Sequence, residues 1–148
     1  MTGVCSTRNV DLVRSLGADD VIDYTKEDFT QRRQAYDLLL DVVANRSISD
    51  CRRVLQPEGI GVLAGAPHGG WTVIAYMLKI AVASKIGRPK VVTFMAEIRQ
   101  EDLLVINKLI EAGKVMPVVD RTYPLSETAE ALRYLEEGHA RGKVVIVV

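Results

Sequence analysis

The most constraining stretch of this sequence is a nearly continuous apolar run at residues 36–45, which reads YDLLLDVVAN. Its core is three consecutive leucines and two valines, interrupted by Asp41. A strand that is covered on both faces has a continuous apolar sequence, whereas a strand with one solvated face alternates polar and apolar residues. The run therefore predicts a central strand of a mostly parallel sheet that has helices on both sides.

A second apolar run, GIGVLAG at residues 59–65, follows a short amphipathic segment and a turn predicted at residues 57–59. Two buried strands joined through a helix form a βαβ unit, and its right-handed crossover places both strands in one sheet. Their carboxyl ends then meet at the same edge, which is where ligands of open α/β sheets bind. The segments that end these two strands are therefore the first place to look for a binding site.

The rest of the chain alternates between short strands and helical segments. Further strands are predicted at residues 2–5, 21–24, 90–95, 115–119 and 143–148, the last of them buried. Helices are predicted at residues 10–16, 26–34, 48–55, 71–84, 101–112 and 126–137. This alternation is typical of the α/β class.

Local signals define several ends and faces of these helices. Ser47 and Ser126 are expected to act as N-caps, because a serine hydroxyl accepts hydrogen bonds from the backbone N–H groups of the first turn. Glycine, which ends helices readily, follows three of the predicted helices, at Gly17, Gly113 and Gly138. The positions expected to face inward are Ile48, Cys51, Val54 and Leu55 in one helix and Leu103, Ile106 and Ile110 in another.

Composition excludes several classes of function. The chain has 148 residues, enough for one core of ordinary size and too few for two comfortable domains. Lysine plus arginine and aspartate plus glutamate number 19 each, so no basic field is available for nucleic acid or an anionic membrane. No stretch approaches the roughly 18 apolar residues that span a bilayer, and the first residues do not resemble a signal sequence. A cytoplasmic protein is therefore expected.

The residues that most often carry chemistry are few. Cys5 and Cys51 are widely spaced, which predicts two buried, reduced thiols and neither a disulfide framework nor a zinc knuckle. His68 lies in a glycine-rich loop, where it either approaches a substrate or is an ordinary surface residue. His139 follows a helix end, where it can interact with the helix dipole. No residues have zinc-ligand spacing or a Ser/His/Asp arrangement, so no metal site is expected.

Five segments carry a family resemblance through their order and spacing over nearly the whole chain. They are LVRSLGADDVIDY at residues 12–24, YDLLLDVV, LQPEGIGVLAG, EDLLVINKLIEAGKVMPVVDRTYPLSE at residues 101–127, and YLEEGHARGKVVIVV at the end. Together they resemble the medium-chain dehydrogenase/reductase superfamily, in its zinc-independent, quinone-oxidoreductase-like branch. The resemblance implies a Rossmann-like parallel sheet with flanking helices, in the strand order 3-2-1-4-5-6. It makes residues 1–114 a partial dinucleotide-binding domain and residues 115–148 a C-terminal segment that joins the catalytic domain in relatives.

The sequence departs from this family pattern at its amino end. Family members have a first strand that ends in a glycine-rich turn, and the turn receives the cofactor pyrophosphate at a helix N-terminus. The strand predicted at residues 2–5 corresponds to the second strand of the family's sheet, so the sequence looks truncated before it. We therefore expect this chain alone to bind a dinucleotide weakly or not at all and to be inactive by itself.

The resemblance also implies a cofactor. Ser6, Thr7 and Arg8 follow the strand at residues 2–5, where dinucleotide enzymes recognise the adenosine ribose. An acidic residue there binds a free 2′-hydroxyl, whereas small hydroxyls with an arginine suit a 2′-phosphate. Residues 6–9 contain no acid, so the resemblance implies NADP, as NADPH, and not NAD. The alternative is that Ser6 or Thr7 only caps the helix and that Arg8 is solvated.

Other positions are implied to contact the same cofactor. Tyr24 ends the third family strand and is expected beside the 2′-phosphate or the adenine, or else is an ordinary half-buried tyrosine. The remaining positions end the two apolar strands and would flank the nicotinamide ribose through backbone groups, namely Val43, Ala44, Gly65 and Ala66. A tight turn without a ligand is the alternative for the last two.

The function implied is that of an NADP-dependent oxidoreductase that acts on a small molecule, of quinone, enone or alcohol dehydrogenase-like type. Its catalytic residues are unknown. The lack of a catalytic cluster does not count against a reductase, because hydride transfer needs a positioned cofactor and no protein nucleophile. A homodimer is expected through the strand at residues 90–95, of which Lys90 is the first and Met95 the last. The helix at residues 71–84 is apolar over much of its surface and should pack against another domain or subunit. The alternative function is a truncated, non-catalytic association module of the same fold.

Overall fold

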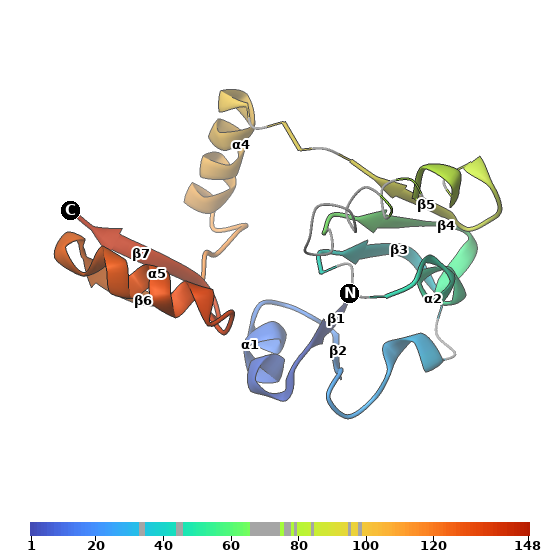
Figure 1. Ribbon diagram of the computed structural model, residues 1–148, viewed down its shortest axis with the longest axis horizontal. Coiled ribbons are helices and arrows are strands. Elements are labelled where there is room, and N and C mark those ends of the chain that lie inside the picture. Colours follow the sequence, from blue (N-terminus) through green and yellow to red (C-terminus); the bar gives the residue numbers. More distant parts are fainter. Residues whose placement is uncertain are drawn as a thin grey trace. The chain divides into compact units, whose positions relative to one another are not determined.

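The computed structural model describes residues 1–32, 35–43, 46–65, 75, 78, 80–83, 85–94, 96, 97 and 99–148. These residues form two compact units, the first made of Met1–Val21 with Glu97–Val148 and the second of Ile22–Ala96. Both units contain parallel strands with flanking helices (Figure 1), which confirms the predicted α/β, Rossmann-like class.

The second unit is built on a three-stranded parallel sheet in the order β3-β4-β5. Its elements are η2 at Phe29–Gln31, β3 at Tyr36–Asp41, α2 at Ile48–Arg53, β4 at Leu55–Leu63 and β5 at Lys90–Thr93. Ser47 caps α2 as predicted, because its hydroxyl accepts a hydrogen bond from the Asp50 N–H at 3.1 Å. The unit therefore has the predicted βαβ connection from β3 through α2 to β4.

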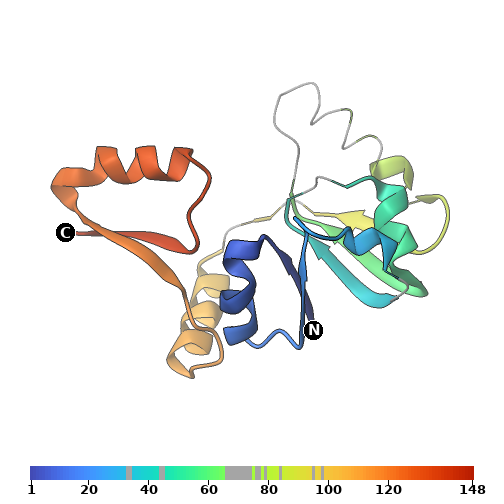
Figure 2. The same ribbon diagram turned by 90° about the horizontal axis from the view of Figure 1, so that it is seen from below.

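The core of this unit lies between one face of the sheet and its helices (Figure 2). Cys51 of α2, Leu63 of β4, Val91 of β5 and Ile80 form a buried cluster in which none is more than 1% exposed. Leu39 of β3 packs against this cluster from the same face. The helix predicted at residues 48–55 ends at Arg53, and its predicted inner positions Val54 and Leu55 are buried although Leu55 already begins β4.

The prediction that β3 is a central, doubly covered strand was wrong for the described residues. β4 is the middle strand, and β3 pairs with β4 alone among the described strands. Successive side chains of a strand point to opposite faces, so Leu39 faces the core whereas Leu38 and Leu40 are 63% and 61% exposed. An apolar run indicates that a strand is suited to burial on both faces, but burial also requires other elements to pack on each face.

The first unit contains the two ends of the chain. Its elements are β1 at Thr2–Cys5, η1 at Thr7–Asn9, α1 at Val10–Ser15, α4 at Gln100–Glu111, β6 at Val119–Pro124, η3 at Leu125–Glu127, α5 at Thr128–Glu136 and β7 at Lys143–Val147. β1 pairs with β2 at Asp20–Asp23, and β6 pairs in parallel with β7 across the connection through α5. Glycines with positive φ follow α1, α4 and α5 as predicted, at Gly17, Gly113 and Gly138.

Several local predictions were wrong, each for an identifiable reason. The helix predicted at residues 26–34 is only the turn η2 in its described part, because the Asp28 carboxylate accepts the Thr30 N–H at 2.9 Å and closes a local turn instead. The turn predicted at residues 57–59 lies inside β4, which extends the strand back to Leu55. Ser126 is no N-cap, since it lies within η3 and α5 begins at Thr128.

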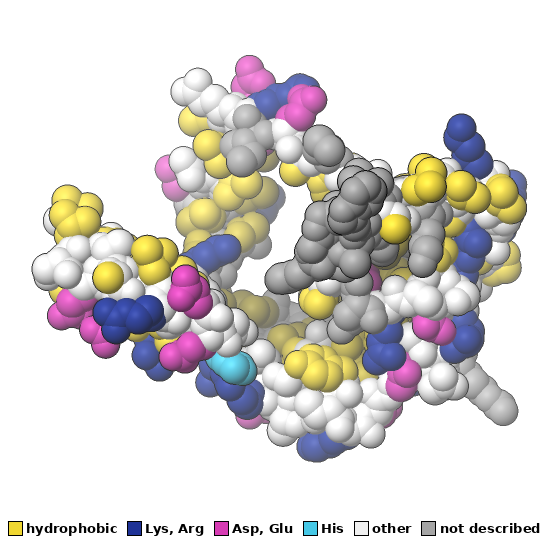
Figure 3. All heavy atoms as spheres, in the orientation of Figure 1, with side chains coloured by type: hydrophobic (Ala, Val, Ile, Leu, Met, Phe, Trp, Pro, Cys, Tyr) yellow, Lys and Arg dark blue, Asp and Glu magenta, His cyan; other side chains and the backbone are white. Residues whose placement is uncertain are grey.

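The C-terminal part of the first unit is less buried than its apolar pattern predicts. The strand predicted at residues 115–119 begins at Val119, and β7 is half-exposed instead of buried. Leu103 and Ile106 of α4 are 52% and 47% exposed, and Figure 3 shows hydrophobic side chains on the surface along this helix. The sequence pattern correctly predicts an apolar face on α4, but that face is exposed in the part of the chain that the structure describes.

The described strands form three separate sheets, β1-β2, β3-β4-β5 and β6-β7. Most of the helix predicted at residues 71–84 lies outside the described residues, as do Ala44, Ala66, His68 and Met95. Within the described part, no helix is long and apolar enough to cross a membrane.

Candidate functional site

The turn that follows β1 contains the three residues predicted to recognise the adenosine ribose. β1 passes close to α1 at Gly3, where an added Cβ would lie 2.5 Å from Cγ1 of Val13. Ser6 has an extended backbone, and its carbonyl accepts the Asn9 N–H at 2.9 Å. Its side chain makes no capping hydrogen bond, so the alternative that Ser6 caps the helix does not hold. The strand and turn therefore present Ser6, Thr7 and Arg8 together directly beyond β1.

Arg8 is exposed but is held by the protein. Its Nη2 donates a hydrogen bond to the backbone carbonyl of His139 at 3.1 Å. A guanidinium has five N–H donors, so this contact leaves most of them for another acceptor. No carboxylate forms an ion pair with Arg8 in the part of the chain that the structure describes.

The loop that Arg8 contacts, at residues 139–142, is fixed by its own backbone contacts. The Asp120 carboxylate accepts hydrogen bonds from the Tyr134 hydroxyl at 2.6 Å and from the Arg141 N–H at 3.0 Å. These two bonds, the first one most of all, hold the pKa of Asp120 below its ordinary value. The Lys143 N–H donates to the Val118 carbonyl at 2.7 Å. The loop therefore has a defined position beside β6.

A second hydrogen bond joins this loop to the turn after β1. Nε of Arg141 donates to Oδ1 of Asn9 at 3.2 Å, across 132 positions of sequence. The contacts of Asn9, Asp120, Tyr134 and Arg141 were not anticipated from the sequence. No periodic pattern relates residues so far apart, and the predicted site was restricted to the ends of the strands.

The carboxyl ends of β3 and β4 come together in the second unit, as the parallel arrangement predicts. The backbone carbonyl of Asp41 accepts the Ala64 N–H at 2.8 Å, and its carboxylate accepts the Val43 N–H at 3.0 Å. A Cβ added to Gly65 would lie 2.6 Å from the Val42 carbonyl oxygen. The structure thus brings Val43 and Gly65 together, and the turn itself requires glycine at position 65.

The remaining predicted site residues are distributed between the units. Tyr24 follows β2 and is 55% exposed, in the second unit with Val43 and Gly65. Ser6, Thr7 and Arg8 belong to the first unit. Ala44 and Ala66 lie outside the described residues. Two separate groups therefore stand as candidates, the turn after β1 and the end of the β3-β4 pair.

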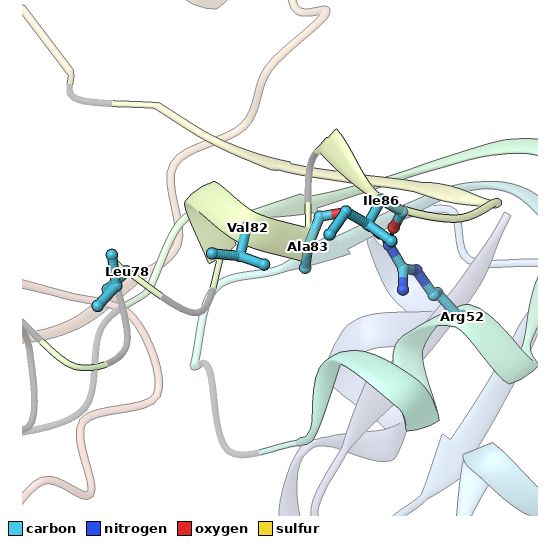
Figure 4. Close-up of a pocket in the computed structure, with 5 residues that line it drawn as sticks. All are labelled: Arg52, Leu78, Val82, Ala83 and Ile86. Atoms are coloured by element: carbon cyan, nitrogen blue, oxygen red, sulfur yellow. Dashed lines mark hydrogen bonds between the residues drawn. The ribbon is translucent and has the colours of Figure 1, made fainter.

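An open depression of about 460 Å³ lies elsewhere in the second unit, lined by Arg52, Leu78, Val82, Ala83 and Ile86 (Figure 4). Figure 4 shows Arg52 reaching from α2 towards the segment that carries Ala83 and Ile86. Its Nη2 donates to the carbonyls of these two residues, both at 2.7 Å. Among the described residues that line the depression, Arg52 has the one charged side chain, and it is engaged in holding the backbone.

Both cysteines are buried and reduced, as predicted. Burial, together with the nearby charges of Asp41 and Asp50, raises the pKa of the Cys51 thiol to about 11. No three His, Cys, Asp or Glu side chains of the described residues come close enough to hold a metal ion.

Cys51 should make the stability of the protein fall at alkaline pH. Its pKa is raised from 9.0 to about 11 on folding, so its contribution is fully present below pH 9 and is lost as pH rises to 11 and above. A shift of this size lowers the free energy of unfolding by about 2 kcal/mol at pH 11 relative to pH 8. Urea unfolding of wild type and Cys51→Ala at several pH values measures this, and the variant should lose less stability. Equal pH dependence of the two proteins would show that Cys51 ionises normally.

Comparison with known proteins places the chain in a family. A family model described as zinc-binding dehydrogenase matches residues 16–146. The NADPH-dependent alkenal/one oxidoreductase, chloroplastic, of Arabidopsis thaliana is 34% identical over 148 residues, which cover 99% of this chain and 33% of that protein. The NAD(P)H oxidoreductase RTN4IP1, mitochondrial, of Mus musculus is 34% identical over 168 residues, which cover 100% of this chain and 41% of that protein. The chain thus spans less than half the length of these curated relatives.

Solved structures agree with this placement. The quinone oxidoreductase from Coxiella burnetii superimposes with a TM-score of 0.77 at 26% identity, covering 99% of this chain and 44% of that one. A putative alcohol dehydrogenase from Sinorhizobium meliloti 1021 has the same fold, with a TM-score of 0.72 at 22% identity over 99% of this chain and 40% of that one. The chain therefore belongs to the zinc-binding dehydrogenase family, within the medium-chain dehydrogenase/reductase superfamily.

Proposed function

We propose that this chain is the cofactor-binding portion of an NADP-dependent oxidoreductase that reduces quinones or enones. The observation that carries the proposal is the turn after β1, where Arg8 stands beside two small hydroxyl residues and no acid occurs at residues 6–9. A 2′-phosphate needs cationic and hydroxyl donors, whereas a carboxylate there would repel it. The names of the relatives, which include NADPH-dependent and NAD(P)H oxidoreductases, support a nicotinamide cofactor.

In this proposal, each group of predicted site residues has its own role. Ser6, Thr7 and Arg8 would hold the adenosine 2′-phosphate, and the contact of Tyr24 with the phosphate or the adenine stays a prediction. The ends of β3 and β4, at Val43, Ala44, Gly65 and Ala66, would flank the nicotinamide ribose through backbone groups. Bound NADPH supplies a hydride for a carbonyl-conjugated substrate. The chain itself would bind and orient the cofactor, and the proposal assigns no zinc to it.

Titration calorimetry with NADPH and NADH tests the cofactor choice. We expect NADPH to bind more tightly than NADH, although weakly, because the sequence lacks the glycine-rich pyrophosphate turn. Arg8→Ala should lower NADPH affinity about tenfold and leave NADH unchanged, since the lost hydrogen bonds are to a charged group.

Arg14→Ala is the matched control for this titration. It removes the same charge from the neighbouring helix α1, where Arg14 is 62% exposed and lies 3.7 Å from Asp11. This variant should bind NADPH like the wild type. An equal loss in both variants, or equal heats with NADPH and NADH, would contradict the assignment of NADP to the turn.

A second candidate function is a non-catalytic association module, favoured by the exposed leucines of β3 and the open apolar face of α4.

Homodimerisation through β5, at the edge of its sheet opposite β3, is part of either proposal. Light scattering over a concentration series should give twice the monomer mass, and Val92→Lys within β5 should reduce it. A clean monomer at all concentrations would remove the pairing proposal.

A cytoplasmic location stays a prediction, since relatives include chloroplastic and mitochondrial proteins.

A further inference from the structure

Arg52 of α2 is a partly buried cation without an acidic partner among the described residues. Its Nε donates to the Pro89 carbonyl at 3.0 Å, and its Nη2 donates to the Ala83 and Ile86 carbonyls, both at 2.7 Å. These carbonyls accept hydrogen bonds but carry no net charge, and no described carboxylate forms an ion pair with Arg52. A charge that is partly removed from water is costly unless a counter-charge accompanies it. The surroundings of Arg52 therefore favour an anion.

One nitrogen of the Arg52 guanidinium is open to a ligand. A guanidinium has five N–H donors, and the three bonds to backbone carbonyls use those of Nε and Nη2. Both N–H groups of Nη1 are therefore left for another acceptor. A Cβ added to Gly87 would lie 3.4 Å from Nη1, so the glycine at this position leaves that nitrogen uncovered. Nη1 is thus the atom at which Arg52 can meet an anionic ligand.

The depression beside Arg52 is otherwise lined by apolar side chains. Leu78 and Val82 are helical positions one turn apart, so their side chains share one face, and Ile86 continues this row towards Arg52 (Figure 4). All three side chains are exposed, whereas Ile80, between the first two in sequence, is buried in the core. The core of the second unit therefore uses one apolar face of this segment and leaves another open. The volume of about 460 Å³ is within the range of pockets that hold small molecules.

We propose that this depression binds a medium-chain aliphatic carboxylate, with its acyl chain along Leu78, Val82 and Ile86 and its carboxylate at Nη1 of Arg52. The carboxylate supplies the missing counter-charge and accepts charge-assisted hydrogen bonds from the guanidinium. The acyl chain covers apolar side chains that otherwise contact water. Such binding involves none of the residues assigned to the cofactor, so it does not depend on the proposed NADP-dependent function.

Decanoate and decyltrimethylammonium test this site, because they have the same alkyl chain and opposite charges. Each is titrated below its micellar concentration into the full 148-residue chain, and the amide resonances of Ala83 and Ile86 are followed by nuclear magnetic resonance. Decanoate should shift these resonances to saturation and bind at least about tenfold more tightly than the cation. Equal affinities would show that Arg52 does not select an anion, and the proposal would be overturned. An absence of saturable shifts with millimolar decanoate would overturn it as well.

Val82→Glu places a carboxylate in the apolar row and should weaken decanoate binding about tenfold, because it repels the ligand and gives Arg52 a counter-charge of its own. Val105→Glu is the matched control, since Val105 is an exposed valine of α4 in the other unit, and this variant should bind decanoate like the wild type. Thermal unfolding of each variant checks that the chain remains folded. Unchanged affinity in Val82→Glu, or an equal loss in both valine variants, would contradict the assigned site.

Arg52→Gln should abolish the preference for decanoate over the cation, because it removes the charge at the end of the row. Arg52 also holds three backbone carbonyls, so the valine variants decide the question if Arg52→Gln does not fold. Light scattering identifies the competing occupant, a second copy of the chain. If Val82→Glu converts a dimer into a monomer and the wild type does not bind decanoate, the apolar row is a contact between copies and the carboxylate site is overturned.

Discussion

Replacing Leu63 by alanine is expected to lower the free energy of unfolding of the second unit by about 2 to 5 kcal/mol. Leu63 is 1% exposed and packs in one cluster with Cys51, Ile80 and Val91. The substitution removes buried methyl groups and leaves a cavity, because the surrounding sheet and helices relax only in part. Urea unfolding followed by far-ultraviolet circular dichroism measures the loss as a lower midpoint.

Leu40→Ala is the matched control for this prediction. Leu40 lies on the neighbouring strand β3, opposite Val62 of β4, and is 61% exposed. Its truncation should change stability by no more than about 0.5 kcal/mol, as for other exposed positions. Comparable losses for the two leucines would mean that β3 is covered on both faces after all, as its sequence predicts.

Gly142→Ala should destabilise the first unit by about 2 to 4 kcal/mol. The added Cβ would lie 2.4 Å from the Val118 carbonyl oxygen and 3.0 Å from the Val118 carbonyl carbon. Backbone atoms cannot rotate away as a flexible side chain can. The chain must shift at the hydrogen bond from Lys143 to Val118, which lies directly beside the first β6-β7 register pair. Loss of ellipticity and a lower thermal midpoint would report the effect.

Gly113→Ala provides the comparison for this effect, because it isolates backbone strain from a clash. Gly113 has a φ of +67° after α4, and no atom lies within 4 Å of its added Cβ. Only the left-handed conformation is penalised there, at about 1 to 2 kcal/mol. If Gly142→Ala cost no more than Gly113→Ala, the approach of β7 to Val118 would be looser than the structure shows.

The elements that the sequence predicted well are those whose signals are local. The Ser47 cap, the buried face of α2 and the glycines after three helices depend on residues within one or two turns of each other. Local competition also explains a failure, since the Asp28 side chain binds the Thr30 backbone and replaces a predicted helix with a single turn. Such competition depends on rotamers that residue type does not determine.

The features that the sequence did not predict depend on distant partners. Leu39 and Leu40 are identical residues in one apolar run, yet one packs on the core and the other is exposed, because only one face of β3 is covered. The junction of Arg8 with His139 and of Asn9 with Arg141 joins the two ends of the chain. Reasoning from strand ends considers only residues that are close in sequence, so it could not predict contacts across more than 130 positions.

The placement of β3 at the margin of its sheet bears on how this polypeptide behaves in concentrated solution. β3 pairs with β4 on one side, and no described strand pairs with its other side. The middle of β3 consists of three leucines. An exposed edge strand of this kind templates cross-β aggregation unless charged residues, proline or a covering segment prevent the addition of another strand. Asp37 and Asp41 flank the leucines without interrupting them. Fibril nucleation should therefore begin at β3 wherever no donated strand protects it.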